Sequence, residues 1–469
     1  MVAAAFGTIG RVVRDLLTPP PWSAGGKVTG GAHTRSLDAA GGGRRGAGLG
    51  TFGQLNSEIA AGQHMVGSRA AYLAANNAWM SNARGNLVAY LVGTGARPTA
   101  RNVSRQERRQ VQRRFETWAA RADFLGRTDF FGLQQQVAND LVVYGESLVL
   151  MHDEPEGLQL QVIAPDHLDA SKTAQLGDGR MIVNGVEFDA RGRRLGYWVL
   201  PDRPHSTFAE FAPAVRVDAR DVCHIFHPIG SGQVRGLSWF APAILPANEL
   251  DQLTDALLVA AKLAAMHAAF VTDVNDTATD EHPLEDPVWE PGAITRLPFG
   301  TDVKFSSPDQ VKEAPALVRM NLQALAAALG LPEHLVSGDL SNANYSSLRA
   351  GLMPFRARME QVQYATLAPQ FLRPVWERWL TREVLLGELD IPADTPADWI
   401  MPRPQQVDPL KDMEATEKAL ALGLTSRRQA VNEAGWLIDD LDEEILADRE
   451  REAELGLSFT TSRGEPDAA

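Results

Sequence analysis

The sequence predicts an α+β protein, because its hydrophobic pattern changes period along the chain. Apolar residues recur at helical spacing before Tyr144 and after Pro246, whereas the stretch from Ser147 to His227 consists of short β-type runs separated by Gly, Asp and Pro turns. The chain has 469 residues, of which 44% are apolar, so it can bury a sizeable core. Its length favours several substructures over one compact domain.

The N-terminal region begins with a segment, residues 1–50, that is rich in glycine and contains consecutive prolines. We expect this segment to be flexible or extended. From Leu55 to Trp79 apolar residues recur at broadly helical spacing, which predicts a helix. The run Leu87–Val92, which ends before Gly93, predicts a strand.

Capping signals place the next two helices. Ser104 followed by Glu107 is a capping box, so a charged helix should run from Ser104 to Ala122. Asp129 is a good N-cap for a second helix, which should end near Tyr144. Short strands should follow at Ser147–His152, Leu158–Ile163, Met181–Phe188, Gly196–Leu200 and Val222–His227.

Two helices that bracket a β insert are predicted next along the chain. Leucines and alanines form one stripe from Pro246 to Val271, which predicts a long helix whose small residues allow close neighbours. Strands are expected at Ile294–Leu297 and Val303–Ser306. The second helix should run from Pro315 to Leu329, because a glycine and then Pro332 follow it.

The C-terminal part is predicted to be mostly helical. A turn-rich segment, Glu333–Asn344, precedes a long helical stretch, Ser346–Leu386. Kinks or breaks are expected in that stretch at Pro354, Pro369 and Pro374. From Asp408 we expect two polar helices around Gly423 and Gly435, which end in the acidic stretch Asp439–Glu454.

Composition limits the possible partners. Lys and Arg number 45 and Asp and Glu number 59, which gives a formal net charge of −14. This acidity is the opposite of the basic footprint of a tight DNA-binding protein, so any DNA contact must be local or weak. The single cysteine, Cys223, excludes an internal disulfide and suits a reducing compartment. The longest apolar run, Leu257–Val271, is broken by Lys262 and His267, and we expect no membrane contact.

Common catalytic motifs are absent from the sequence, and no catalytic residue is predicted. The chain has no G-x-x-x-x-G-K-[ST] phosphate loop, no G-x-S-x-G and no H-E-x-x-H. Cys223, His224 and His227 resemble a metal-binding set, but on a strand His224 faces the opposite side from the other two. We therefore expect neither a metal nor a cofactor. An enzyme that acts on polymers stays open as an alternative, since convergent polar groups are not visible in one sequence.

A colinear set of short motifs extends from Asn56 to about Leu457. The most telling of them are Gly145-Glu146, His224-x-Phe226, Gly232-Gln233-x-Arg235-Gly236-x-Ser238-Trp239 and Asp339-x-Ser341-x-x-Asn344-Tyr345-Ser346-Ser347-x-Arg349. Together and in this order, they make the chain resemble the lambda family of portal proteins of tailed bacteriophages. Two features depart from the family pattern: Gly230-Ser231 stands where the family usually has Arg-Pro, and the segment Thr272–Pro291 is short.

The resemblance implies a portal fold with a wing, a two-helix stem, a small β clip, a long kinked wing helix and a helical crown. It also implies assembly into a dodecameric ring. The implied boundaries are 1–50 for the flexible N-terminal segment, 51–238 for the wing, 239–271 for the first stem helix, 272–308 for the clip, 309–331 for the second stem helix, 332–345 for a tunnel loop, 346–405 for the long wing helix and the return to the wing, and 406–469 for the crown and acidic tail.

The function that the resemblance implies is that of a head–tail connector, a ring-shaped channel at one capsid vertex for DNA packaging and ejection. The implied partners are further copies of the chain, double-stranded DNA that passes without sequence specificity, the large terminase subunit, a head–tail adaptor, and the major capsid or scaffolding protein. The ring would assemble in the cytoplasm of a host bacterium and end at the portal vertex of the virion, for a phage or a prophage. Another virion ring protein, such as a head–tail adaptor or a baseplate component, is the alternative, and it should lack two helices around a β insert.

The predicted DNA-facing residues lie in the tunnel loop and the helix behind it. An acidic channel does not grip the phosphate backbone, whereas a few polar or cationic groups at a constriction can guide it. Arg349 and Arg356 lie two turns apart on one helix face, which suits phosphate or subunit contacts. Pairing of both arginines with neighbouring carboxylates is the alternative. The full predicted set is Ser341, Asn342, Asn344, Tyr345, Arg349 and Arg356.

Overall fold

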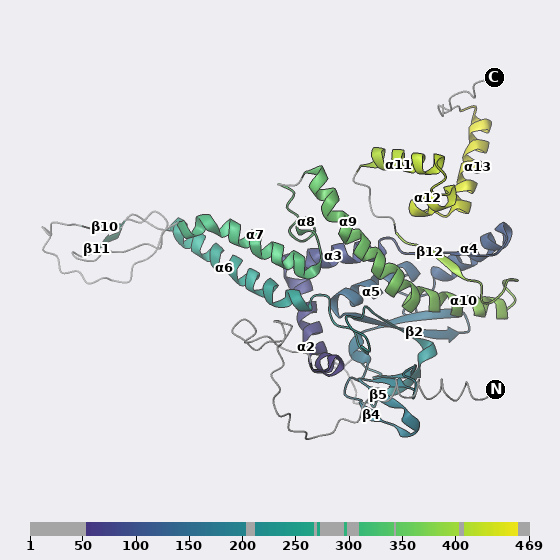
Figure 1. The fold of residues 1–469 in the computed structure, drawn as a ribbon, viewed down its shortest axis with the longest axis horizontal. Coiled ribbons are helices and arrows are strands. Elements are labelled where there is room, and N and C mark those ends of the chain that lie inside the picture. The colour runs from purple at the N-terminus through teal and green to yellow at the C-terminus, as the bar shows by residue number, and fades with distance from the viewer. Residues whose placement is uncertain are drawn as a thin grey trace, which may run out of the picture. The chain divides into compact units, whose positions relative to one another are not determined.

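A computed structural model describes residues 53–202, 212–266, 270–272, 295–297, 309–341, 344–402 and 408–457. The chain divides into two units, Met1–Gly53 and Gln54–Ala469, and the description below concerns the second. The predicted flexibility of residues 1–50 lies outside the described residues. Figure 1 shows that the second unit mixes helices with small sheets, so the predicted α+β class is confirmed.

Four helices open the described part of the chain. They are α2 (Leu55–Asn76), α3 (Ala78–Val92), α4 (Arg105–Ala119) and α5 (Phe130–Val143). The predicted caps are confirmed: Ser104 and Glu107 form a reciprocal capping box on α4, and the Asp129 side chain accepts from the Gly132 N–H at the start of α5. The predicted strand at Leu87–Val92 is wrong, because these residues form the last turns of α3. Leu87 and Leu91 are both buried at the four-residue spacing of one helix face.

The middle of the chain forms two antiparallel sheets. The three-stranded sheet has the order β3-β2-β9, and the five-stranded sheet has the order β4-β5-β6-β7-β8. The predicted strand at Met181–Phe188 is split in two by a turn at Asn184 and Gly185, both of which have positive φ. The bounds are β2 (Glu146–Glu154), β3 (Gly157–Ile163), β4 (Ala174–Gln175), β5 (Met181–Val183), β6 (Val186–Phe188), β7 (Arg194–Val199), β8 (Val215–Asp218) and β9 (Val222–Phe226), with short 3-10 helices η2 (Pro165–His167), η3 (Gly177–Gly179), η4 (Ala219–Asp221) and η5 (Ala241–Ala243).

Two long helices, α6 (Ile244–Met266) and α7 (Asp309–Leu329), lie side by side (Figure 1). The first ends before the predicted Val271, because Phe270–Thr272 form strand β10, which pairs in parallel with β11 (Thr295–Leu297). The second begins before Pro315, which is accommodated inside the helix. A proline at that position removes one backbone hydrogen bond donor, and its ring crowds the carbonyl of the preceding turn. The strand predicted at Val303–Ser306 lies outside the described residues.

The long helical stretch runs without a break from Tyr345 to Leu385, and of the three prolines at which kinks or breaks were predicted only Pro369 lies inside the segment where the helix type changes. Helix α9 (Tyr345–Val362) contains Pro354, the π-helix η6 (Gln363–Leu372) contains Pro369, and α10 (Arg373–Leu385) has Pro374 in its first turn. The wider π turn fits a segment in which a proline has removed a backbone donor. A short helix, α8 (Glu333–Ser337), precedes this stretch.

The C-terminal region has three helices where two were predicted. They are α11 (Pro409–Ala421), α12 (Arg427–Glu433) and α13 (Ile438–Leu455). The acidic stretch at Asp439 forms α13, a helix separate from those on either side of Gly423. A two-stranded ribbon joins distant parts of the chain, because β1 (Arg97–Ala100) pairs antiparallel with β12 (Ala397–Ile400).

The main core lies between the N-terminal helices, the three-stranded sheet and the stretch from α9 to α10. It contains a group of aromatic rings: Phe115 of α4 contacts Trp118, Phe130, Trp376 and Trp379 at centroid distances of 5.1 to 5.9 Å. A second, smaller core lies between the two sheets. None of the helices in the described ranges has the length and apolarity that a membrane crossing requires.

Candidate functional site

The predicted tunnel loop begins at the end of α7 and is fixed to α3. Gly330 has φ +67° and ends α7, and α8 ends at Gly338, which has φ +74°. The Asn86 side-chain amide of α3 donates to the Leu335 carbonyl at 2.7 Å, and the Asn82 amide donates to the Val336 carbonyl at 3.0 Å. These bonds satisfy carbonyls that a five-residue helix leaves unpaired. The base of the loop is therefore held by the helical body.

The tip of the loop is exposed and ordered by local hydrogen bonds. The Ser341 N–H donates to Asp339 Oδ1 at 2.8 Å, and hydrogen bonds from Ser341 hold the pKa of Asp339 below its usual value. Asp339 also lies 3.9 Å from the Arg319 guanidinium of α7. The predicted residue Asn342 lies outside the described residues. The loop tip is thus oriented partly by an Asx-type turn.

Asn344 is the N-cap of α9. Its side-chain oxygen accepts from the Ser347 N–H at 2.8 Å, and the Ser347 hydroxyl lies 3.1 Å from the Asn344 N–H. The oxygen of the Asn344 side chain, which was predicted to face DNA, is therefore already used to cap α9. Tyr345 is the first residue of α9, and its side chain lies outside the description.

The two predicted arginines differ in their surroundings. Arg349 lies on the exposed side of α9, where its guanidinium is 3.6 Å from the Asp412 carboxylate of α11. Arg349 therefore pairs with a neighbouring carboxylate, which is the alternative that the sequence left open. Arg356, two turns further along α9, is half-buried. A contact of either arginine with DNA stays a prediction.

The motif residues Glu146, His224 and Arg235 meet in a buried ionic cluster that sequence reasoning did not anticipate. The Arg235 guanidinium donates to Glu146 Oε1 from Nε at 2.8 Å and from an Nη at 2.5 Å. Glu146 Oε2 accepts from the Gly236 N–H at 2.7 Å and lies 2.9 Å from His224 Nε2. The Gln63 amide of α2 adds a bond of 2.7 Å. The side chains of Glu146 and His224 are 0% exposed and that of Arg235 is 3% exposed.

Protonation in this cluster follows from burial and pairing. Burial opposes ionisation of Glu146, but Arg235 and His224 outweigh it and hold its pKa well below the usual value. Burial lowers the pKa of His224 to about 4, against the opposing hydrogen bond to Glu146. His224 is therefore neutral at neutral pH and donates from Nε2 to Glu146. Its Nδ1 has no hydrogen bond partner among the described residues.

The cluster joins several elements that are distant in sequence. Arg235 also donates to the Asn184 carbonyl in the β5–β6 turn at 3.2 Å and to the Pro165 carbonyl at 3.3 Å. The backbones around it approach closely, because a Cβ on Gly145 would lie 2.0 Å from the Leu237 carbonyl carbon and one on Gly236 would lie 2.2 Å from the Gly145 oxygen. The only sign of this cluster in the sequence was that its glycines and charged residues lie in the motifs shared with the portal family.

The suspected metal set at Cys223 is dispersed. Cys223 Sγ packs 4.0 Å from Met151 Sδ, and burial raises the pKa of its thiol to about 12. His224 belongs to the ionic cluster, and His227 Nδ1 lies 3.2 Å from the Thr366 hydroxyl. Within the described ranges no group of three His, Cys, Asp or Glu side chains is placed to bind a metal.

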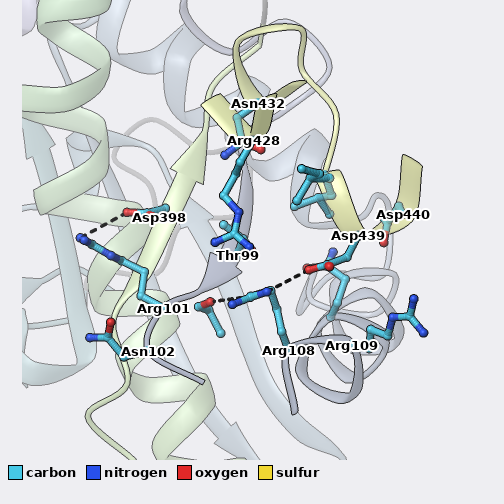
Figure 2. Close-up of a pocket in the computed structure, with 14 residues that line it drawn as sticks. Thr99, Arg101, Asn102, Arg108, Arg109, Asp398, Arg428, Asn432, Asp439 and Asp440 are labelled. Atoms are coloured by element: carbon cyan, nitrogen blue, oxygen red, sulfur yellow. Dashed lines mark hydrogen bonds and ion pairs between the residues drawn. The ribbon is translucent and has the colours of Figure 1, made fainter. Parts of the chain in front are cut away.

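A second ionic cluster connects α13 to α4 at the surface (Figure 2). Asp439 at the start of α13 lies 3.0 Å from Arg108 and 3.3 Å from Arg105, and Glu443 lies 2.7 Å from Arg109. Arg105 is 58% exposed and Glu443 is 42% exposed, so water reaches these two side chains, whereas Arg108 and Asp439 are 15% and 14% exposed. No described residue of α11, α12 or α13 is fully buried.

Comparison with known proteins places this chain among phage proteins. The model of the family described as "Phage portal protein, lambda family" matches residues 44–363. The chain belongs to this family. The matched range contains the predicted tunnel loop, the buried ionic cluster and both long helices α6 and α7. The C-terminal helices α11, α12 and α13 follow it.

Individual relatives agree with the family. The chain is 23% identical over 341 residues to the "Portal protein" of Escherichia phage N15, which covers 63% of this chain and 62% of the relative. It is also 23% identical over 340 residues to "Portal protein B" of Escherichia phage lambda, with the same coverage. The match thus spans less than two thirds of these relatives. Among solved structures, a chain from "Neck of empty GTA particle computed with C6 symmetry" aligns with a TM-score of 0.40 and 15% identity over 89% of this chain and 97% of that chain.

Proposed function

We propose that this protein is the portal subunit of a tailed phage or prophage, and that copies of it form a dodecameric ring through which double-stranded DNA is packaged and ejected. The observation that carries the proposal is the family match across residues 44–363. In this proposal residues 51–238 form the wing, 239–271 and 309–331 the stem helices, 272–308 the clip, 332–345 the tunnel loop, 346–405 the long wing helix and the return to the wing, and 406–469 the crown.

Apolar side chains exposed on the paired helices support assembly into a ring. Leu258 and Val259 of α6 and Leu317 and Met320 of α7 are about half exposed in the isolated chain. Apolar groups gathered on a long helix pair are typical of subunit contacts, and identical subunits close most readily into a symmetric ring. We propose that α6 and α7 of one subunit pack against those of its neighbours.

The charge of the chain supports a channel that conducts DNA without holding it. With a net charge of −14, most of the surface repels the phosphate backbone, and no groove-reading motif is present. Contacts of Ser341, Asn342, Asn344, Tyr345, Arg349 and Arg356 at a constriction would guide the duplex by polar groups. Binding would then be independent of base sequence.

The remaining partners follow from this role. We propose that the large terminase subunit docks on the ring and supplies ATP hydrolysis, so the portal itself is not an enzyme. A head–tail adaptor and the major capsid or scaffolding protein would contact the same ring at other stages. The subunits would assemble in the bacterial cytoplasm and end at the portal vertex of the virion.

A packaging assay with loop variants tests the DNA contact. We expect particles that carry Asn344→Ala with Arg349→Ala to assemble normally but to package less DNA, measured as encapsidated DNA per capsid. Asp412→Asn is the matched control, because it breaks the Arg349 ion pair but keeps the arginine. Normal packaging by the double variant, or an equal loss with Asp412→Asn, would remove Arg349 from the channel.

A further inference from the structure

A pocket of about 260 Å³ lies between the β1–β12 ribbon and α4 on one side and α12 and the start of α13 on the other (Figure 2). Its ribbon and α12 walls come from distant parts of the sequence, Thr99–Asn102 and Arg428–Asn432. The second of these walls follows residue 363, beyond the part of the chain that the family model matches. The proposed channel function therefore does not account for this pocket.

Four arginines line the pocket, in a chain whose net charge is −14. Arg108 is held in place, since it donates to the Ala100 carbonyl and to Asp439 at 3.1 and 3.0 Å. Arg109 pairs with Glu443, yet its buried Nε has no hydrogen bond partner in the described ranges. Arg101 lies 3.4 Å from Asp398.

Arg428 provides the charge that is not balanced. Figure 2 shows its guanidinium reaching from α12 across the pocket toward Thr99. Within the described part of the chain Arg428 has no carboxylate within ion-pair distance, although three other lining arginines do. Its neighbours on the pocket wall include the Thr99 hydroxyl and the Asn432 amide, which can both donate hydrogen bonds.

The three lining carboxylates do not cancel this charge. Asp398 is paired with Arg101, and Asp439 is paired with Arg105 and Arg108. The pKa of Asp440 is raised by burial and by the neighbouring Glu116 and Glu443 carboxylates, so this group takes up a proton more readily. Four lining arginines against three lining aspartates leave the pocket with one formal cation in excess.

We propose that this pocket binds a phosphate group, with Arg428 on α12 and Arg101 beside β1 as its principal ligands. A guanidinium presents a planar fork that matches two oxygens of an oxyanion. The oxygens of a tetrahedral phosphate point in several directions, so they can accept hydrogen bonds from forks on two walls at once. A bound phosphate would connect α12 to the β1–β12 ribbon and strengthen the contact between them.

Titration of the full-length protein with inorganic phosphate, against chloride at equal ionic strength, tests the site. We expect saturable binding by calorimetry and at least about tenfold weaker binding by Arg428→Gln, because one charge-assisted hydrogen bond pair is lost. Arg101→Gln should weaken binding as well, and it serves if the first variant misfolds. The matched control is Arg451→Gln, on the exposed side of α13 and outside the pocket.

The proposal would be overturned if phosphate and chloride gave the same calorimetric signal with the wild-type protein. It would also be overturned if the two pocket variants bound phosphate as tightly as the control variant.

A second experiment, in which a short DNA duplex is added, identifies the source of the phosphate. Displacement of the duplex by phosphate, with equal weakening of both by Arg428→Gln, supports the site and assigns it to a DNA backbone. Phosphate binding that is sensitive to Arg428→Gln, with no duplex binding at the pocket, supports the site and assigns it to free phosphate or a small ester. Duplex binding without phosphate binding contradicts the site.

Discussion

The molecule contains two ionic clusters of similar composition and very different surroundings. Glu146, Arg235 and His224 lie in the core with side chains between 0% and 3% exposed. The second cluster is at the rim of the molecule: Arg105, Arg109 and Glu443 are 58%, 35% and 42% exposed, and Arg108 and Asp439 are 15% and 14% exposed. Desolvated charges depend entirely on one another, whereas solvated charges can exchange a partner for water. We therefore expect the buried cluster to be essential for the fold, whereas the contact between α13 and α4 can open without unfolding the rest of the protein.

Removal of the buried carboxylate should have the largest effect. Glu146→Ala leaves Arg235 charged and without its partner in the core, and we expect the free energy of unfolding to fall by about 3–5 kcal/mol. Urea denaturation followed by circular dichroism measures it. Glu443→Ala in the second cluster is the comparison, because Glu443 and its partner Arg109 are 42% and 35% exposed, and it should cost less than about 1 kcal/mol. Equal losses would show that burial does not distinguish the clusters.

Acid should weaken the buried cluster before the surface cluster. The pKa of His224 is lowered from an ordinary value of 6.5 to about 4 by burial, so the unfolded chain takes up this proton at higher pH than the folded chain. The contribution of His224 to stability is complete above pH 6.5 and is lost as the pH falls toward 4. Glu146, whose pKa is lowered by Arg235 and His224 despite its burial, adds to the loss below its ordinary value of 4.5.

Denaturation midpoints at several pH values between 7 and 4 measure this decline. We expect His224→Gln, which retains a hydrogen bond donor but does not titrate, to have a shallower decline than the wild type. An unchanged slope in the variant would mean that His224 is already protonated in the folded protein.

Salt should act mainly on the surface cluster. Exposed pairs are screened by added salt, so we expect faster backbone hydrogen exchange in α13 at high ionic strength with little change in α5 or β2. Asp439→Asn should produce the same local increase at low salt, since it weakens the contacts to Arg105 and Arg108. If the rate of hydrogen exchange in α13 changed with neither salt nor the substitution, apolar contacts would be what holds this helix.

Local signals account for the parts of the fold that the sequence predicted. The caps at Ser104 and Asp129 depend on neighbouring residues, so a few positions were enough to place α4 and α5. The run Leu87–Val92 was wrongly predicted as a strand, because a short apolar run in a helix and one in a buried strand have similar composition. Residues near Val271 changed from helix to strand through pairing with β11, which is distant in sequence.

The candidate sites were less predictable than the fold. Arg349 and Asn344 were chosen because they lie in a motif. The sequence did not show that Asp412 and Ser347 would be their partners, because this depends on the tertiary fold. The buried cluster was missed although its motifs were recognised, since nothing in one sequence shows that residues 146, 224 and 235 converge. Convergence of this kind is set by tertiary packing.

Electron microscopy of the purified full-length protein tests the proposed portal role most directly. The proposal predicts ring-shaped particles with a central channel wide enough for a DNA duplex, and a reconstruction in which α6 and α7 of neighbouring subunits line it. A compact monomer at all protein concentrations, or an assembly without a central channel, would contradict it.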